Sequence, residues 1–386
     1  MFTRKVLAFS GIRSDYDLLS GLYKRINDDP DFSFGLIVSG AHLSESYGYT
    51  VKHIEADNLP ILAKIESLLD SNSKSSRLKS ASICMQNCLH TVEAFNPDVI
   101  IFPGDREDVM VGALVGAYLG IPTVHFFGGD HACDGNVDNS VRHAASKLSS
   151  LHFVSHPSHK ERLLKIGEPA NRIYVVGNPA LDKFKNTEHI VKTELLSRMG
   201  KTDWTDYGLM IFHPILGYEE WAGKYFEEIL ISLKKYGIKT FVSYPNSDAG
   251  NKTIINVIEK YTQDEQFCFY KNLERELFVN IMRNATLMIG NSSAGLFEAP
   301  MIPLGVVNVG HRQKGRLAVE NVVFVDQGIN NICAGIEMVT SRQFQEKLKG
   351  VSSPYGLGDS IDKAYDLLKK LDFELYRYKP EDPLLS

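Results

Sequence analysis

The chain has 386 residues, of which 44% are hydrophobic and 23% are charged, and these are the proportions of an ordinary soluble globular protein. Its length predicts two domains, each large enough to bury its own core. The formal net charge is −5 and no run is rich in lysine or arginine, which argues against nucleic-acid binding and against attachment to a membrane surface. The charge of an anionic ligand must therefore be met locally.

No apolar stretch approaches the roughly 20 residues of a membrane span, and the sequence passes from Met1 almost directly into a strand-like run. The five cysteines are scattered without a CxxC pair, as is typical of a reducing compartment. We therefore expect a cytoplasmic protein without a signal peptide.

Apolar runs alternate with helical periodicity through the first half of the chain. Val6–Ser10 is followed by helical spacing as far as Ile26, and Phe34–Ser39 is the next predicted strand. Further strands are expected at 97–103, 122–127, 152–155 and 173–176, and helices at 78–95, 108–119 and 137–149. Segment 44–75 is polar and poorly periodic, and we expect a helix at about 60–70.

The alternation starts again in the second half. Strands are expected at 207–212, 240–243, 286–290, 303–307 and 322–325, and a last amphipathic helix at 361–371. This pattern predicts an α/β protein with two Rossmann-like domains that face a cleft. We place the first domain at 1–178 and the second at 179–360, with 361–386 crossing back onto the first.

The stretch 123–143 has the features of an active-site loop. Its apolar strand ends in two glycines, where open α/β sheets place their ligands. Histidines and carboxylates then crowd together: His125, Asp130, His131, Asp134, Asp138 and His143. Because no histidine pair has ligand spacing on one predicted element, and Arg142 would oppose a cation, acid–base chemistry is favoured over a metal site.

Two other strand ends carry polar groups. Asp105, Arg106 and Glu107 follow the strand at 97–103. They form either a self-neutralising cap or a carboxylate that faces a reacting sugar while Arg106 holds it or a phosphate. His213 precedes a proline at another strand end, where a lone histidine is more often structural.

The motif Asn291-Ser-Ser-Ala-Gly295 is expected to open a helix, whose N-terminus could bind a diphosphate. A simple N-cap is the alternative. Glu298, one turn further, favours a nucleoside-diphosphate site because its carboxylate could accept two ribose hydroxyls. Arg13, in the loop after the first strand, could hold phosphate through two hydrogen bonds, with a surface salt bridge as its alternative.

Together these motifs resemble those of the hydrolysing UDP-N-acetylglucosamine 2-epimerases of sialic-acid biosynthesis, which have a glycosyltransferase-B-like fold. The resemblance covers nearly the whole chain. It rests on Gly11-Ile-Arg-Ser-Asp-Tyr16, Gly104-Asp-Arg106, His125 with Gly128-Gly129, Asp138 with Arg142-His-Ala144, Gly177-Asn-Pro-Ala-Leu-Asp182, His213-Pro214, Asn246 with Asp248, Asn291-Ser-Ser293 with Glu298, and Arg312-Gln-Lys-Gly-Arg316 with Glu320-Asn321.

The resemblance implies that a carboxylate removes the C2 proton of UDP-GlcNAc, that UDP leaves C1, and that water adds to the glycal to give free ManNAc. It implies Asp105 and Asp138 as acid and base, and His213 as a partner of the leaving phosphate or a proton relay. The substrate residues expected are Arg13, Asp15, Arg106, His125, Arg142, His143, Asn246, Ser292, Ser293, Glu298 and Arg312. No cofactor or metal is expected, and the assembly expected is a homodimer or homotetramer.

One departure from the family pattern concerns the substrate. Phe127 stands where the family usually has a glutamate. Either Asp130 takes over that carboxylate's catalytic role, or the loop serves a less polar sugar such as the UDP-2,4-diacetamido-2,4,6-trideoxyhexose of a legionaminic-type pathway. UDP-GlcNAc is the first interpretation. A non-hydrolysing epimerase is less favoured because Ser-Asp-Tyr, not Pro-Glu, follows Arg13; a glycosyltransferase or a non-catalytic nucleotide-sugar sensor is also less favoured.

Overall fold

The computed structural model describes residues 3–70, 75–133, 135, 137–246, 248–271 and 273–383. Asp134, one of the acidic residues of the predicted loop, lies outside the described residues. The chain divides into two compact units. Unit 1 is Met1–Asp130, Val137–Lys183 and Tyr355–Ser386, and unit 2 is His131–Asn136 and Phe184–Pro354.

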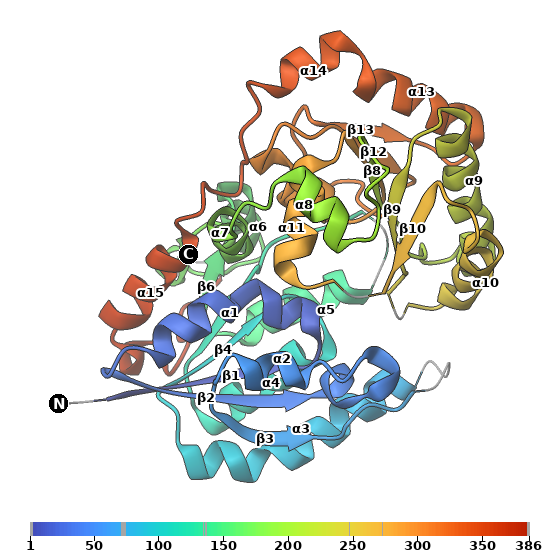
Figure 1. The fold of residues 1–386 in the computed structure, drawn as a ribbon. Coiled ribbons are helices and arrows are strands. Elements are labelled where there is room, and N and C mark those ends of the chain that lie inside the picture. Colours follow the sequence, from blue (N-terminus) through green and yellow to red (C-terminus); the bar gives the residue numbers. More distant parts are fainter. Residues whose placement is uncertain are drawn as a thin grey trace. The chain divides into compact units, whose positions relative to one another are not determined.

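The described part of unit 1 is built on one parallel sheet with strand order β3-β2-β1-β4-β5-β6-β7 (Figure 1). The strands are β1 Arg4–Ser10, β2 Phe32–Ser39, β3 Ile61–Ile65, β4 Val99–Pro103, β5 Thr123–Phe126, β6 Leu151–Val154 and β7 Ile173–Val175. The helices are α1 Arg13–Asn27, α2 Val51–Ala56, α3 Ser76–Phe95, α4 Glu107–Leu119, α5 Val137–Leu148, α6 Pro157–Lys165 and α15 Ser360–Lys370, while α7 Pro179–Asn186 begins in unit 1 and ends in unit 2. Parallel neighbours require crossover connections, which these helices provide.

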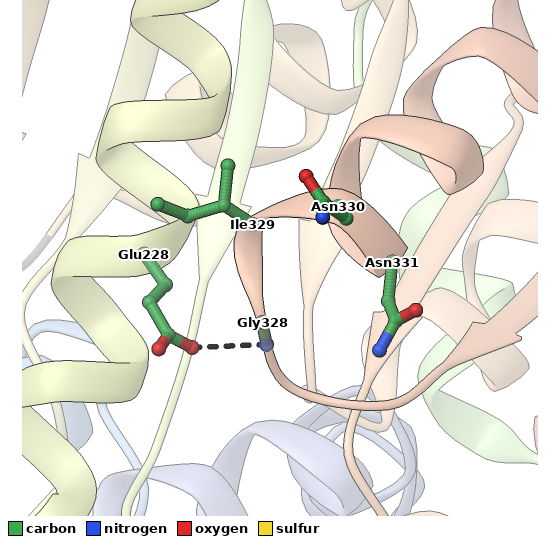
Figure 2. A pocket seen from close by; sticks show the side chains of 5 residues that line it. All are labelled: Glu228, Gly328, Ile329, Asn330 and Asn331. Atoms are coloured by element: carbon green, nitrogen blue, oxygen red, sulfur yellow. Dashed lines mark hydrogen bonds between the residues drawn. The ribbon is translucent and has the colours of Figure 1, made fainter.

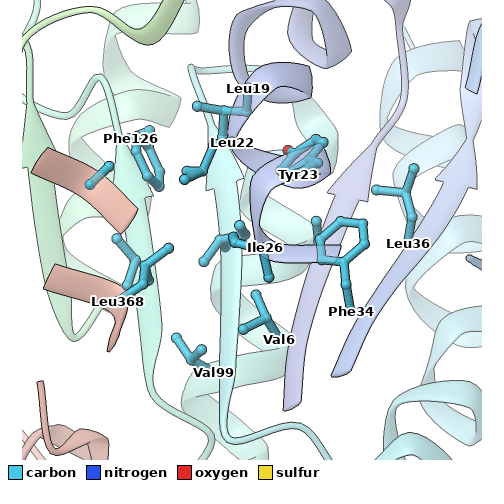
Figure 3. Close-up of a cluster of buried hydrophobic side chains, with 14 of the residues drawn as sticks. Val6, Leu19, Leu22, Tyr23, Ile26, Phe34, Leu36, Val99, Phe126 and Leu368 are labelled. Carbon is cyan, nitrogen blue, oxygen red and sulfur yellow. The ribbon is translucent and has the colours of Figure 1, made fainter. Parts of the chain in front are cut away.

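Both faces of this sheet are buried, which explains why its central strands are continuous apolar runs. Val6 and Ala8 of β1 belong to a cluster with α1 and α15, which we call the first core (Figure 3). Leu7 and Phe9, which point to the opposite face, pack with residues of α3 and α4. Alternate residues of one strand therefore support two separate helix layers.

The C-terminal segment returns to unit 1, as the fold prediction expected. Leu368 of α15 is fully buried in the first core, and the Arg4 guanidinium donates hydrogen bonds to the carbonyl groups of Leu368 and Leu371. The carboxylate of Asp182 accepts the backbone N–H groups of Ser360 and Ile361 at 3.0 and 2.9 Å. These bonds fix the start of α15 to the segment after β7.

Unit 2 repeats the architecture, with a parallel sheet of strand order β10-β9-β8-β11-β12-β13 among its described residues. The strands are β8 Gly208–Ile211, β9 Thr240–Ser243, β10 Phe267–Tyr270, β11 Leu287–Gly290, β12 Val306–Val309 and β13 Val322–Val325. The helices are α8 Lys192–Arg198, α9 Ala222–Lys235, α10 Asn251–Tyr261, α11 Arg275–Asn284, α12 Ala294–Phe297, α13 Ile329–Thr340 and α14 Arg342–Leu348.

The predicted α/β class with two Rossmann-like sheets is confirmed, but one predicted element is wrong. The helix expected at about 60–70 is the edge strand β3, in which Ile61, Ala63 and Ile65 alternate with more exposed residues. That period of two is the signature of a half-buried strand. Across the described ranges, no helix combines the length and apolarity needed to cross a membrane.

Candidate functional site

The carboxyl ends of β4 and β5, which are paired neighbours, bring a charged cluster together in unit 1. Asp105 follows β4, and Arg142 lies on α5, which follows β5. Arg142 forms an ion pair with Asp105, and its Nη1 lies 3.3 Å from Oδ2 of Asp130. Only 5% of the Arg142 side chain is exposed. A guanidinium this deeply buried requires carboxylate partners, and these two supply them.

Asp130, for which a catalytic role was predicted, lies among charged and aromatic partners in unit 1. This residue is buried, with Arg142 at one carboxylate oxygen and Nε2 of His159 at 3.5 Å from the other. Burial lowers the pKa of His159 to about 4, so that imidazole is neutral near pH 7. Asp130 is therefore a buried counter-charge for Arg142, and its catalytic role stays a prediction.

Asp138 lies in the first turn of α5 and faces a residue that the sequence did not indicate. Nη2 of Arg77, from α3, donates to Oδ1 of Asp138 at 3.2 Å. The same guanidinium donates Nε and Nη2 to Glu107 at 3.0 and 2.7 Å. Burial raises the pKa of Asp138 and the charge of Asp105 raises it further, while Arg77 opposes the shift.

The first turn of α1 carries Arg13 and Asp15. Burial raises the pKa of Asp15 to about 7, although the charge of Arg106 counteracts this. Arg106 is the N-cap residue of α4 and lowers the pKa of Asp138 as well. Nε of Arg13 lies 3.6 Å from Asp17 one helical turn away, which is the salt bridge that the sequence left as an alternative.

The carboxyl group of Asp108, which was not predicted, packs against the loop after β1. It accepts a hydrogen bond from Oγ of Ser39 at 2.9 Å, and burial raises its pKa to about 6. A Cβ atom on Gly11 would overlap the Asp108 carboxylate. Glycine at position 11 is therefore what allows Asp108 to pack against the loop after β1.

His125, for which a substrate contact was predicted, is held by hydrogen bonds within unit 1. The ring is fully buried, with Nε2 at 2.7 Å from the Gly104 carbonyl oxygen and Nδ1 at 3.0 Å from Oγ of Ser146. Burial lowers the pKa of His125 to about 3. A neutral imidazole with both nitrogens bonded within unit 1 links the loop after β4 to α5. His143, also on α5, is half-buried.

Phe127 follows β5 with a φ angle of 64°, a conformation that bulky residues rarely adopt. Its ring packs against the first core, and its N–H donates to the Phe153 carbonyl at 3.1 Å. Core packing therefore accounts for an aromatic residue at this position, and Phe127 does not by itself indicate a less polar sugar.

In unit 2, neutral amides organise the strand ends. The side chain of Asn291, after β11, accepts the His213 N–H and donates to the His213 carbonyl, both at 2.8 Å. The Asn246 N–H, after β9, donates to Nδ1 of His213 at 3.2 Å. Because Nδ1 accepts, the neutral ring carries its hydrogen on Nε2. Asn291, fully buried, was noted as part of a motif but not as a site residue.

The loop after β12 also converges on Asn291. Nη1 of Arg312 and Nε2 of Gln313 donate to the Asn291 carbonyl at 3.2 and 2.9 Å. Oγ of Ser292 accepts the Ala294 N–H at 3.3 Å, and Ser293 is the N-cap residue of α12. The described helix α12 has only four residues, so it cannot provide the strong helix dipole that was expected here. The backbone N–H groups available to a ligand are those of the local turn.

Glu298 ends α12 and is paired within unit 2. Its Oε1 accepts a hydrogen bond from Nη2 of Arg275 on α11. The sequence pointed to Glu298 but not to Arg275, which lies on a helix and has no strand-end signal.

A hollow in unit 2 lies apart from all of these residues. Figure 2 shows it at the start of α13, lined by Glu228, Gly328, Ile329, Asn330 and Asn331. The Glu228 carboxylate accepts the Gly328 N–H at 3.0 Å. This hydrogen bond satisfies a backbone donor just before α13. None of the residues that line the hollow is a predicted site residue.

Comparison with known proteins decides the family. The family model for UDP-N-acetylglucosamine 2-epimerase matches residues 24–369. The chain belongs to the UDP-N-acetylglucosamine 2-epimerase family. A relative from Legionella pneumophila, named UDP-N,N'-diacetylbacillosamine 2-epimerase (hydrolyzing), is 33% identical over 368 residues, which cover 95% of this chain and 96% of the relative.

Two further members of the epimerase family are similar over most of their length. A UDP-N-acetylglucosamine 2-epimerase from Neisseria meningitidis is 29% identical over 338 residues, covering 88% of each chain. The crystal structure of a UDP-GlcNAc 2-epimerase from Neisseria meningitidis, bound to UDP-GlcNAc, superposes with a TM-score of 0.80 at 18% identity, covering 95% of this chain and 100% of that one. The structural likeness shows the shared fold.

Proposed function

We propose that this epimerase-family enzyme is a hydrolysing 2-epimerase, which converts a UDP-linked 2-acetamido sugar into UDP and the free sugar inverted at C2. The observation that carries the proposal is the pair of carboxyl groups at neighbouring strand ends of unit 1, Asp105 and Asp138, whose charges interact. Two carboxyl groups in different surroundings can act as base and acid in one reaction.

The reaction proceeds in two stages. One of the carboxylates takes the C2 proton, the C2 electron pair forms a C1=C2 double bond, and the bond from C1 to the UDP oxygen breaks. Water then adds to the glycal, so that its oxygen bonds to C1 and a proton reaches C2 on the opposite face. A raised pKa suits Asp138 to releasing and recovering a proton.

We assign UDP to the strand ends of unit 2. The Asn246 N–H directs the His213 hydrogen to Nε2, where it can donate to the leaving diphosphate. Ser292, Ser293 and Arg312 offer further donors to the diphosphate. Glu298 accepts from Arg275 through Oε1, and we assign the ribose to its Oε2.

The contacts proposed in unit 1 are with the diphosphate and the sugar. We assign phosphate to Arg13, which would exchange its surface salt bridge for a stronger anion. Asp15, Arg106 and His143 are the remaining proposed contacts of the sugar. Arg142 acts on the sugar only through Asp105, because its side chain is buried.

Two substrates fit this chemistry. UDP-GlcNAc would give ManNAc, and a UDP-2,4-diacetamido-2,4,6-trideoxyhexose would give the corresponding free diacetamido sugar. The Legionella pneumophila relative, at 33% identity, supports the diacetamido sugar, whereas the Neisseria meningitidis relative, at 29%, supports UDP-GlcNAc. We therefore place the diacetamido sugar first and UDP-GlcNAc second, which reverses the order drawn from motifs alone.

The decisive experiment incubates the enzyme with each UDP-sugar in D2O and follows the products by NMR. We expect UDP and a free sugar that is inverted and deuterated at C2, formed faster from the diacetamido substrate. Faster turnover of UDP-GlcNAc would reverse the substrate order. A UDP-linked epimer as product, or no turnover of either sugar, would contradict a hydrolysing 2-epimerase.

Asp138→Asn should abolish turnover because an amide cannot exchange the proton. UDP binding, measured by calorimetry, should stay within about twofold of wild type, since the UDP contacts proposed in unit 2 are unchanged. A fully active variant would remove Asp138 from the mechanism.

A further inference from the structure

The structure places Arg77, a residue to which no role in the reaction has been assigned, directly against Asp138. We propose that Arg77 is a positioning residue for Asp138, whose guanidinium orients this carboxyl group and sets the pH at which it exchanges its proton. The importance of this role for turnover rests on the proposed function, because that function makes Asp138 an acid or base.

The contact geometry supports a fixed guanidinium. Nε and Nη2 of Arg77 both donate to Oε2 of Glu107, at 3.0 and 2.7 Å, so two bonds set the plane of the group. Burial alone would raise the pKa of Glu107, but the hydrogen bond and charge of Arg77, together with a backbone hydrogen bond and the charge of Arg106, lower it overall. Nη2 then reaches Oδ1 of Asp138 at 3.2 Å.

Asp138 lies among charges of both signs. Asp105, from the loop after β4, favours its protonated form, as does burial. Arg77 from α3 and Arg106 at the start of α4 favour the carboxylate. Arg142, on the same helix as Asp138, also interacts with it. Burial and Asp105 prevail, so the pKa is raised, and loss of Arg77 would raise it further.

Arg77 and Arg142, the two arginines that form ion pairs with Asp138 and Asp105, differ in exposure, and this separates their roles. The side chain of Arg142 is 5% exposed and pairs with Asp105 as part of the packed interior. That of Arg77 is 47% exposed, and Asp138 is 24% exposed. Asp138 can therefore break its contact with Arg77 and take a proton from the substrate while the packed interior of unit 1 stays intact. Asp105, in contrast, is held by the buried Arg142.

The test measures the protonation of Asp138 directly. The protein is labelled with carboxyl-13C aspartate and titrated by NMR, and the Asp138 resonance is identified by its absence from Asp138→Asn. Arg77→Met should raise the titration midpoint by about one pH unit, because a neighbouring opposite charge is lost. Arg77→Lys, which keeps the charge without the planar fork, should give a smaller rise.

Arg198→Met is the matched control, because Arg198 is 45% exposed and also lies near two carboxylates, Glu194 and Glu276. It should leave the Asp138 midpoint unchanged. The pH profile of kcat with the UDP-sugar should move with the midpoint in Arg77→Met, while KM stays within about twofold.

The outcomes separate the two proposals. An Asp138 midpoint that is the same in Arg77→Met and in wild type would overturn the role of Arg77, even if turnover is confirmed. A midpoint that shifts in an enzyme unable to turn over either UDP-sugar would uphold the coupling to Arg77 and overturn the proposed function. A shifted midpoint together with a shifted kcat profile supports both.

Discussion

In both units the loops after neighbouring strands are connected by side-chain contacts, but the kind of contact differs. In unit 1 the loops after β4 and β5 are joined by opposite charges, with Arg142 between Asp105 and Asp130. In unit 2 the loops after β8 and β11 are joined by a neutral amide, since Asn291 bonds both backbone groups of His213. Each unit connects neighbouring strand ends: the β4 and β5 ends meet through buried ions, and the β8 and β11 ends through a neutral amide.

The difference follows from what each kind of contact can do. Burying an ion costs desolvation free energy unless the ion is paired. Once buried, its charge shifts the pKa values of the groups around it. An amide that satisfies backbone donors and acceptors has no charge to titrate and fixes the loop geometry. Unit 1 is therefore suited to proton transfer, and unit 2 to a rigid set of hydrogen-bond donors for a ligand.

The largest effect expected comes from Arg142→Met. The substitution leaves Asp105 and Asp130 close together without their shared counter-charge, and Asp130 is buried. Breaking a buried pair by removing one partner costs about 3–5 kcal/mol. We expect a loss of this size in the unfolding free energy of unit 1, measured by amide hydrogen exchange of peptides from α5.

Arg142→Lys is the companion variant, because it keeps a positive charge but cannot reach both carboxylates with a planar fork. It should recover part of the lost stability. A loss of stability below about 1 kcal/mol in Arg142→Met would mean that charge does not hold Asp105, Arg142 and Asp130 together. It would contradict the difference inferred between the two units.

A smaller effect is expected from Asn291→Ala in unit 2. The change leaves the N–H and C=O groups of His213 without their side-chain partner in a buried setting, which costs about 2 kcal/mol. Both tryptophans, Trp204 and Trp221, lie in unit 2, so urea unfolding followed by tryptophan fluorescence reports on this unit.

Asn284→Ala provides the control for Asn291→Ala. The Asn284 amide donates at 2.9 Å to a carbonyl of its own helix, α11, and it is only half-buried. Its replacement should change the unfolding free energy by less than about 0.5 kcal/mol. Equal losses in the two variants would show that the buried amide has no special part in holding the strand ends.

The sequence predicted the central strands well because they are apolar on both faces. It missed two of the four edge strands: β3 was expected to be a helix and β10, Phe267–Tyr270, was not predicted, whereas β7 and β13 were. Edge strands have one neighbour and one wetter side, so their apolar signal is short and mixed with polar residues. The physical information that identifies them is the pairing itself, which a single sequence does not display.

For the site, the sequence located the loops but not the contacts within them. Asp138 and His213 follow strands, and parallel topology gathers such positions at one edge of each sheet. The sequence did not show that His125 and Asp130 are buried, with partners inside unit 1. Arg77 comes from a helix N-terminus after a polar segment, so only packing reveals that it meets Asp138.

The last effect expected is the pH dependence of stability due to Asp15. Its pKa is raised by burial from 3.8 to about 7, so the folded state binds this proton more tightly than the unfolded state. Its contribution to stability is complete below about pH 4 and is lost as the pH rises through about 7. Between pH 5 and 7, Asp15→Asn should therefore flatten the fall in the unfolding free energy of unit 1 by about 1 kcal/mol per pH unit.

Hydrogen exchange of α1 peptides at graded urea concentrations, at pH 5, 6 and 7, measures this slope. Asp203→Asn is the control, because its exposed carboxyl group, whose pKa Lys239 lowers, is ionised in both states across that range. An unchanged slope in Asp15→Asn would mean that the folded state does not favour the proton on Asp15. If the unfolding free energy of unit 2 depended more steeply on pH than that of unit 1, the titrating groups that affect stability would lie in unit 2 and not in unit 1.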